Sequence, residues 1–224
     1  MVDRILYNGA ITTLYDRQPF AEAIAIRDNR VWALGSSERL LRLANAETLM
    51  ENLDGNAVIP GLTDAHIHFE LLSRHLQAVN LYEVPSKAEA LRRIQQQVAE
   101  TPPDTWITGQ GWTQDMWADG AFPSAADLDP ITGDIPAYFS SKSLHAGWAN
   151  SAALRAAGIT ADTDDPPGGQ IVRDASGQPT GVLLEEAMYL VMRVIPAPTP
   201  DELAEYMAYA QDLALSTGLT GIHD

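Results

Sequence analysis

Residues 58–70 read VIPGLTDAHIHFE, and this stretch decides how the rest of the chain is interpreted. An apolar run ends at Pro60-Gly61, and Asp64, His66 and His68 then follow on alternating positions. In an extended strand, side chains two residues apart point to the same side, so we expect these three side chains to share one face of a strand. Two of the chain's five histidines would then face a single point.

Two imidazoles presented in this way can bind a divalent cation. Zn²⁺ accepts neutral imidazole nitrogens at about 2.0–2.1 Å, and Asp64 could orient one ligand from the second coordination shell. In the alternative interpretation, the two histidines are hydrogen-bonded residues without a metal, as in most isolated His-x-His pairs. The motif alone leaves both interpretations open.

The composition limits the classes of function. The chain has 224 residues, 46% of them hydrophobic, which is enough for a packed core. Lys plus Arg against Asp plus Glu gives 14 − 30 = −16, a charge that disfavours nucleic acid and anionic membrane surfaces as partners. There is no cysteine, so any metal must be held by histidine and carboxylate. With no signal peptide and no apolar run of about 18 residues, we expect a cytoplasmic protein.

The chain changes character near residue 58. In residues 1–57, short β-rich runs alternate with turns such as Asp28-Asn29, which predicts a small β domain. In residues 58–224, strands alternate with helices, among them one opened by Ser86, one capped by Asn150 and one running from Thr199 to about Gly218. We expect residues 162–181 to form a surface hairpin.

Alternating strands and helices predict an α/β fold with a mostly parallel sheet, either covered on both faces or closed into a barrel. We count about five barrel-type strands, whereas a (β/α)₈ barrel has eight. The sequence stops inside an apolar strand, which predicts that it is the N-terminal part of a longer protein. Unpaired strand edges would then favour self-association, so we expect a homo-oligomer or a loosely folded segment.

The string V-I-P-G-L-x-D-x-H-x-H closely resembles the signature of the amidohydrolase superfamily. The similarity extends in the same order along nearly the whole chain and points to the YtcJ-like branch, which includes N-substituted formamide deformylase. It is carried by the stretches WITGQGWTQDMW, PSAADLD, SLHAGWANSAAL, GGQIVRDASGQPTGVLLEEA and GLTGIHD.

This resemblance implies a (β/α)₈ barrel, incomplete in this chain, with a small β-sandwich built from both chain ends. It implies one or two divalent ions, most often zinc, with His66 and His68 as the first ligands and Asp64 behind them. The implied reaction is metal-dependent hydrolysis of a carbon–nitrogen bond other than a peptide bond, in a small amide-like substrate. The catalytic base of the family matches no residue here, so we expect it beyond residue 224.

The resemblance also suggests Glu185 as a third metal ligand. The alternative is that Glu185 and Glu186 begin a solvated helix, where negative charge suits the helix dipole. Lys142, one of only two lysines, follows a predicted strand and would be the rival metal bridge if it were carboxylated.

His145 and Trp112 are candidates for substrate contacts. His145 matches a histidine of the branch and lies just after a predicted strand, although a histidine beside Trp148 could equally be a core pair. Trp112 and Trp117 fall in a glycine-rich loop of the kind that lines barrel active sites, and packing of that loop is the alternative role for both.

Two functional hypotheses follow. In the first, the parent protein is a metal-dependent amidohydrolase and this segment alone is incomplete and inactive. In the second, the chain is a truncated or degenerate relative that serves only as a binding or structural piece.

Overall fold

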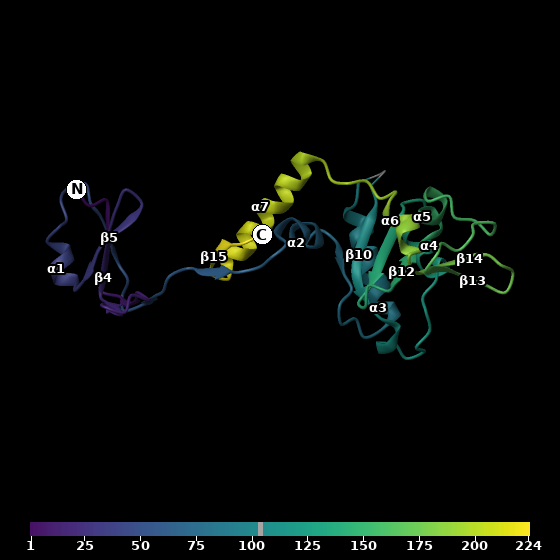
Figure 1. Ribbon diagram of the computed structural model, residues 1–224, viewed down its shortest axis with the longest axis horizontal. Coiled ribbons are helices and arrows are strands. Elements are labelled where there is room, and N and C mark those ends of the chain that lie inside the picture. Colours follow the sequence, from purple (N-terminus) through teal and green to yellow (C-terminus); the bar gives the residue numbers. More distant parts are fainter. Residues whose placement is uncertain (103–104) are drawn as a thin grey trace. The chain divides into compact units, whose positions relative to one another are not determined.

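The computed structural model describes residues 1–102 and 105–224, which divide into two compact units (Figure 1). The first unit comprises Met1–Ile67 and Ala214–Asp224, and the second comprises His68–Leu213. Both helices and strands are present throughout, so the α/β class is confirmed. The expected division at residue 57 stays a prediction. No helix in the described part of the chain is long and apolar enough to cross a bilayer.

The first unit is built mainly of short strands. Its largest sheet has the order β5-β4-β1-β6, with α1 packed on it through Leu40. The strands are β1 (Arg4–Tyr7), β4 (Ala23–Arg27), β5 (Arg30–Gly35) and β6 (Leu49–Asn52), and the helix is α1 (Ser37–Leu41). Asp28 and Asn29 both have positive φ, of 51° and 55°, as a two-residue hairpin turn requires. The predicted reversal between β4 and β5 is therefore confirmed.

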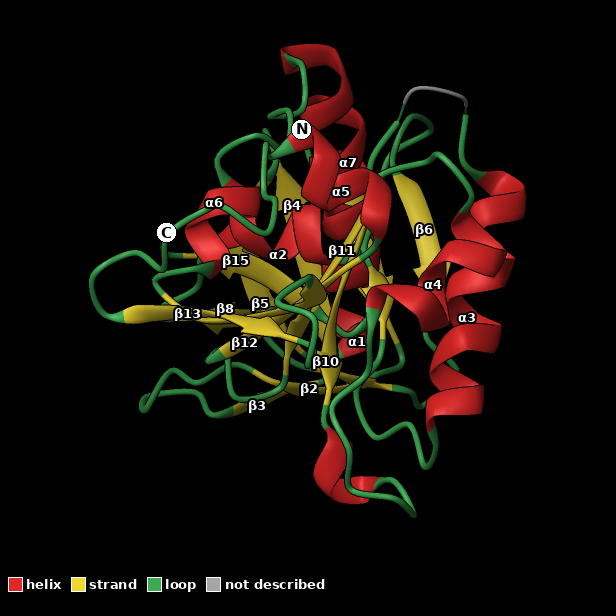
Figure 2. Cartoon of the chain, turned by 90° about the vertical axis from the view of Figure 1, so that its right-hand side faces the viewer, coloured by secondary structure: helices red, strands yellow, loops and turns green. Residues whose placement is uncertain are grey.

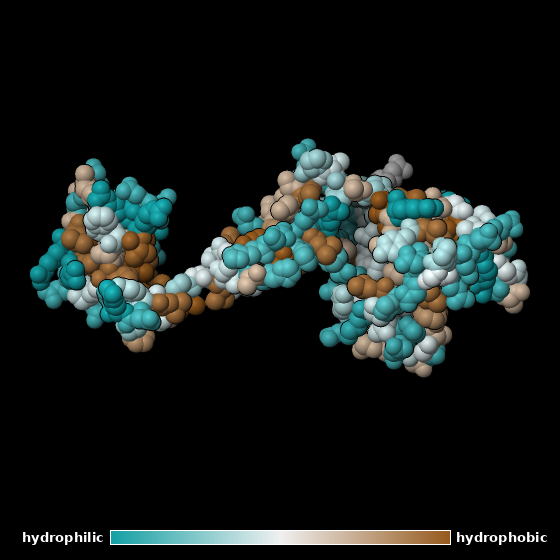
Figure 3. Space-filling view, in the orientation of Figure 1, coloured by the Kyte–Doolittle hydropathy of each residue, from teal (hydrophilic) through white to brown (hydrophobic). Residues whose placement is uncertain are grey.

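Two smaller sheets complete this unit. One has the order β3-β2-β7, formed by Phe20–Ala21, Ala10–Thr12 and Ala57–Val58. In the other, β8 (Leu62–Asp64) pairs in parallel with β15 (Leu219–Ile222). Large apolar side chains are exposed on β5 and β6, the edge strands of the main sheet: Val31, Trp32, Leu49 and Met50. The space-filling view shows hydrophobic surface, in brown, on this unit (Figure 3).

A six-stranded sheet forms the second unit, in the order β13-β14-β12-β11-β10-β9. The strands are β9 (Val79–Asn80), β10 (Ile107–Trp112), β11 (Ala137–Ser141), β12 (Ala146–Ala149), β13 (Gly169–Arg173) and β14 (Pro179–Glu185). β9, β10 and β11 are parallel, whereas β12, β14 and β13 each pair antiparallel with their neighbours. The hairpin expected within residues 162–181 is confirmed as β13–β14.

The expectation of a mostly parallel sheet is wrong for this unit. The sheet is mixed because the chain reverses direction after β11. It turns within four residues and returns as β12 instead of crossing over through a helix. The strands form open sheets in the described ranges, so closure into a barrel stays a prediction.

Helices cover both faces of the six-stranded sheet (Figure 2). Residues of α3 and α4 contribute to the core on one face, and residues of α5 and α6 to the core on the other. The helices of this unit are α2 (Phe69–His75), α3 (Lys87–Glu100), α4 (Ala125–Thr132), α5 (Ser151–Ala156) and α6 (Met188–Met192), with a short 3₁₀ helix at Gln114–Met116; α7 (Pro200–Ser216) leads on to β15.

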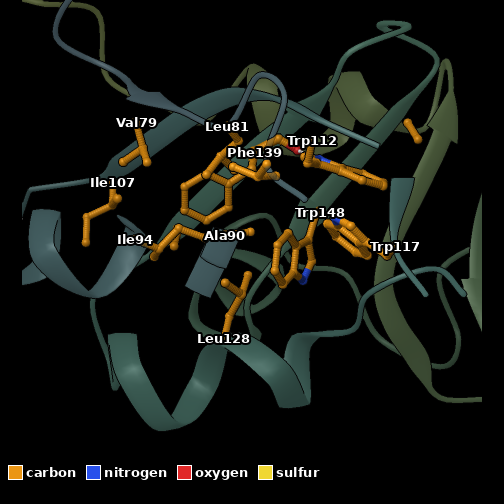
Figure 4. Close-up of a cluster of buried hydrophobic side chains, with 13 residues drawn as sticks. Val79, Leu81, Ala90, Ile94, Ile107, Trp112, Trp117, Leu128, Phe139 and Trp148 are labelled. Atoms are coloured by element: carbon orange, nitrogen blue, oxygen red, sulfur yellow. Dashed lines mark hydrogen bonds between the residues drawn. The ribbon is translucent and has the colours of Figure 1, made fainter. Parts of the chain in front are cut away.

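Consecutive residues of β11 show why both faces must be covered. Tyr138 and Phe139 point to opposite sides of the strand, and both are buried. Phe139 packs against Trp148 with ring centroids 5.8 Å apart, in the cluster drawn in Figure 4, where Ile94 of α3 also lies. Tyr138 belongs to the core on the other side, together with Leu183 and Met188.

At each edge of this sheet, a charged side chain forms a hydrogen bond with a backbone group of the edge strand. At β9, the guanidinium of Arg93 donates to the carbonyl oxygen of Asn80 at 2.9 Å. At β13, the Asp165 carboxylate accepts from the backbone N–H of Ile171 at 3.0 Å. The self-association expected from open edges is untested and stays a prediction.

Two predicted helix starts are confirmed. Ser86 accepts a hydrogen bond from the backbone N–H of Glu89 and caps α3. Asn150 caps α5 by accepting from Ala153 N–H at 2.8 Å. Asn150 does more than cap, because its side chain is fully buried and also bonds three groups outside the helix: the Ala137 N–H, the Thr132 hydroxyl and the Ile135 carbonyl.

We predict that Asn150→Ala destabilises the protein by about 3 kcal/mol or more, since a lost cap costs about 1 kcal/mol and each buried group left unpaired costs about 1–3 kcal/mol. Ser86→Ala, which removes a cap alone, should cost about 1 kcal/mol. Chemical denaturation of the two variants measures the difference. Equal losses would mean that the Asn150 side chain serves only α5.

Candidate active site

The His-x-His segment follows β8, and the boundary between the two units falls within it, since His66 belongs to the first unit and His68 begins the second. The strand ends at Asp64, and His68 is the N-cap residue of α2, with φ −103° and ψ 83°. The expectation that Asp64, His66 and His68 share one strand face is therefore wrong, because the chain leaves the extended conformation to enter α2. Backbone pairing continues past the strand: His223 N–H donates to the Asp64 carbonyl, and Ile67 N–H donates to the His223 carbonyl, each at 3.0 Å.

Asp64 contacts the first histidine of the pair. Its carboxylate Oδ1 accepts a hydrogen bond from the backbone N–H of His66 at 3.0 Å. Such a bond between a carboxylate and an amide two residues on is a local turn that fixes the backbone of the intervening residue. This bond acts on the main chain of His66, and the expected role of Asp64 in orienting a metal ligand stays a prediction.

Two further candidates meet at the carboxyl end of β14. The Nδ1 atom of His145 lies 3.0 Å from Oε2 of Glu185, although the residues are 40 positions apart. The backbone N–H of Glu185 also donates to the His145 carbonyl at 3.1 Å. This contact arises because β12, which follows His145, pairs antiparallel with β14, which ends at Glu185. Glu185 does not begin a helix, since α6 starts at Met188.

The backbone is strained on both sides of this contact. Glu185 and Leu144 have φ of 50° and 64°, in the left-handed region that non-glycine residues avoid. Such conformations cost of order 1–3 kcal/mol each. The His145 and Glu185 side chains are 70% and 56% exposed, and an exposed ion pair contributes about 0–1 kcal/mol. Stability of the fold therefore does not account for the arrangement.

Serine hydroxyls fix the loop that carries His145. The Ser143 hydroxyl accepts from the backbone N–H of His145 at 3.3 Å, and the Ser141 hydroxyl accepts from that of Ala146 at 3.2 Å. The two hydroxyls lie 3.0 Å apart. Sequence reasoning missed these serines, although a serine two residues before a turn residue is a recognised turn former.

Lys142 begins the same loop. Its backbone N–H donates to the Trp112 carbonyl at 2.8 Å, which joins the carboxyl ends of β11 and β10. Its side chain is exposed. The alternative of a carboxylated Lys142 is untested and stays a prediction.

Trp112 is placed in the core. Its side chain is fully buried, and its indole N–H donates to the Phe139 carbonyl at 2.8 Å. The rings of Trp112 and Trp148 lie edge to face with centroids 6.1 Å apart (Figure 4). We therefore assign Trp112 its alternative role, packing, instead of the suggested substrate contact. Trp117 is likewise buried and packs on Trp112.

The donor types in this chain suit a zinc ion. Imidazole nitrogen and carboxylate oxygen are normal Zn²⁺ ligands, and a protein site needs at least three of them. Within residues 1–102 and 105–224, no three His, Asp or Glu side chains gather in a way that could hold an ion. A hollow of about 500 Å³ lies near the start of β10 beside Trp106 and Tyr206, and none of the candidate residues lines it.

Comparison with known proteins decides the family. The pattern that defines the amidohydrolase family matches residues 50–224. The chain belongs to the amidohydrolase family. This confirms the resemblance that the motif at residues 58–68 suggested.

Relatives of this amidohydrolase-family chain are longer than it is. The chain is 36% identical over its whole length to Protein LONG AFTER FAR-RED 3 of Arabidopsis thaliana, of which it covers 38%. It is 32% identical to YtcJ of Bacillus subtilis (strain 168), with 98% of the chain and 42% of that protein covered. It is 30% identical over its whole length to N-substituted formamide deformylase of Arthrobacter pascens, of which it covers 42%.

The fold has a counterpart among solved structures. An uncharacterized metal-dependent hydrolase from Pyrococcus furiosus matches 98% of the chain with a TM-score of 0.74 and 26% identity, and the match covers 43% of that protein. The chain thus spans about two fifths of the length of each of these relatives.

We predict that Trp112→Phe lowers the free energy of unfolding by about 1–3 kcal/mol, because it removes the bond to Phe139 and part of a fully buried ring. Trp32→Phe is the matched control, since Trp32 is 59% exposed and its replacement should change stability by about 0.5 kcal/mol or less. Denaturant titrations of both variants test this. If the Trp112→Phe protein is as stable as the control, the packing role of Trp112 is wrong and the substrate contact is again the better assignment.

Proposed function

We propose that the protein containing this chain is a metal-dependent amidohydrolase that acts on carbon–nitrogen bonds other than peptide bonds, in a small amide-like substrate. The observation that carries the proposal is the Asp64-x-His66-x-His68 segment, which follows a parallel strand in a member of the amidohydrolase family. Two relatives, an N-substituted formamide deformylase and a metal-dependent hydrolase, support the bond type and the metal.

In this proposal His66, His68 and Glu185 hold one or two divalent ions, most simply zinc. These three side chains supply nitrogen and oxygen donors without thiolate, in keeping with a chain that has no cysteine. Further ligands and the catalytic base would come from the part of the protein that this chain does not include. The proposed fold is a (β/α)₈ barrel beside a small β-sandwich.

The metal would activate a water molecule and polarise the bond that is cleaved. The residues of this chain would do the positioning. Asp64 holds the main chain at His66, and the turn at Ser141–His145 holds the imidazole of His145 against Glu185. A carboxylated Lys142 remains the alternative to Glu185 as a metal bridge.

A second candidate function is a non-catalytic one, in which the chain acts as a binding or structural piece. The observation behind it is that the chain spans about two fifths of the length of its relatives. This hypothesis predicts a protein that neither retains a metal nor hydrolyses amides.

The proposed setting is the cytoplasm, with neither nucleic acid nor membrane as a partner. The net charge of −16 would repel phosphates and anionic headgroups. The lack of cysteine fits a reducing compartment.

We predict that the full-length protein carrying this chain purifies with about one or two equivalents of divalent metal and cleaves N-substituted amides but not peptides. His66→Ala and His68→Ala should each reduce metal content and hydrolysis at least about tenfold, because each removes a ligand. His75→Asn is the control, since His75 is the last residue of α2, at the end opposite to His68.

Elemental analysis and an amide panel provide the two measurements. A full-length protein that takes up no divalent metal and hydrolyses no amide after metal is added would falsify the proposal and favour the non-catalytic role. Loss of metal from His75→Asn alone would also contradict it.

A further inference from the structure

His145 has a contact that its suggested role in substrate binding does not explain. A carboxylate only accepts hydrogen bonds, so the 3.0 Å contact with Glu185 requires the proton of the neutral imidazole to be on Nδ1. Glu185 therefore holds the imidazole ring in one tautomer and one orientation, and the ring in turn holds Oε2 of Glu185.

The main chain reinforces this contact from both sides. Glu185 N–H donates to the His145 carbonyl, and Gly169 of β13 pairs with Glu185 across the hairpin. On the other side, the hydroxyls of Ser141 and Ser143 hold the amides of Ala146 and His145. Left-handed, non-glycine backbone persists where the surroundings fix it, and such positions cluster at functional sites.

We propose that His145 is a positioning residue for Glu185: its Nδ1–H holds Oε2, so that Oε1 is kept in place as a metal ligand. Ligating carboxylates are commonly oriented in this way by a hydrogen bond to their second oxygen. The inference rests on the proposed function, because it takes Glu185 as a ligand. In this inference, His145 orients the Glu185 carboxylate and does not bind the substrate.

The test compares three replacements of His145 in the full-length protein. Asparagine places an N–H donor near the position of Nδ1, glutamine places its donor one bond further out, and alanine removes the donor. We expect His145→Ala and His145→Gln to weaken Zn²⁺ affinity about 10–100-fold, and His145→Asn to stay within about threefold of the unaltered protein. Competition with a chromogenic chelator measures these affinities without any substrate.

A double-mutant cycle identifies the route of the effect. In a Glu185→Ala background, His145→Ala should cause no further loss of Zn²⁺ affinity, because the group that it positions is gone. Arg155→Ala is the matched control, as Arg155 contacts a carboxylate elsewhere on the surface of this unit, that of Asp134 at 2.8 Å, and its replacement should leave Zn²⁺ affinity unchanged. Thermal unfolding of the metal-free variants shows that each folds.

The outcomes separate this inference from the proposed function. If Glu185→Ala loses Zn²⁺ affinity while His145→Ala retains it, positioning by His145 is wrong and the hydrolase proposal stands. If His145→Ala and His145→Asn raise KM with Zn²⁺ affinity unchanged, His145 contacts substrate and the inference is again wrong. If the unaltered protein binds no divalent ion at all, both proposals fail together.

Discussion

The burial of two consecutive residues of β11 governs the second unit. Tyr138 and Phe139 point to opposite faces, so the strand is stable only where both faces are covered. One face is covered by α3 and α4 with the tryptophan cluster, and the other by α5 and α6. Because β12 pairs with β11, and β14 pairs with β12, the turn after β11 and the carboxyl end of β14 come to lie at the same end of these strands. The contact between His145 and Glu185 follows from this packing.

Features encoded within a few residues could be predicted from the sequence. The caps at Ser86 and Asn150 and the hairpin turn at Asp28-Asn29 each depend on a local hydrogen bond or a local backbone preference, and each is present. The family could also be predicted, because the residues that indicate it, Asp64, His66 and His68, all lie within five consecutive positions. The β-rich character of residues 1–57 followed from short runs bounded by turn residues.

Features that depend on distant residues could not be predicted. β12 has four residues, all of them buried, so its sequence AGWA shows no alternation between faces. The pairing of β12 with β14 makes the sheet partly antiparallel and joins residues 40 positions apart, and no local signal reports it. Trp112 was assigned to a loop on the strength of its neighbouring glycines, whereas those glycines allow close packing: a Cβ at Gly109 would lie 2.6 Å from the Val79 carbonyl.

The side chains at the two edges of the six-stranded sheet have a consequence for assembly. An incoming strand can extend a sheet only where backbone groups at the edge are available for hydrogen bonding. At β9 it would have to displace the Arg93 guanidinium from Asn80, and at β13 the Asp165 carboxylate from Ile171. Both are charge-assisted bonds, which are stronger than the neutral ladder bonds that would replace them. Arg93 and Asp165 therefore raise the free-energy cost of adding a strand at either edge.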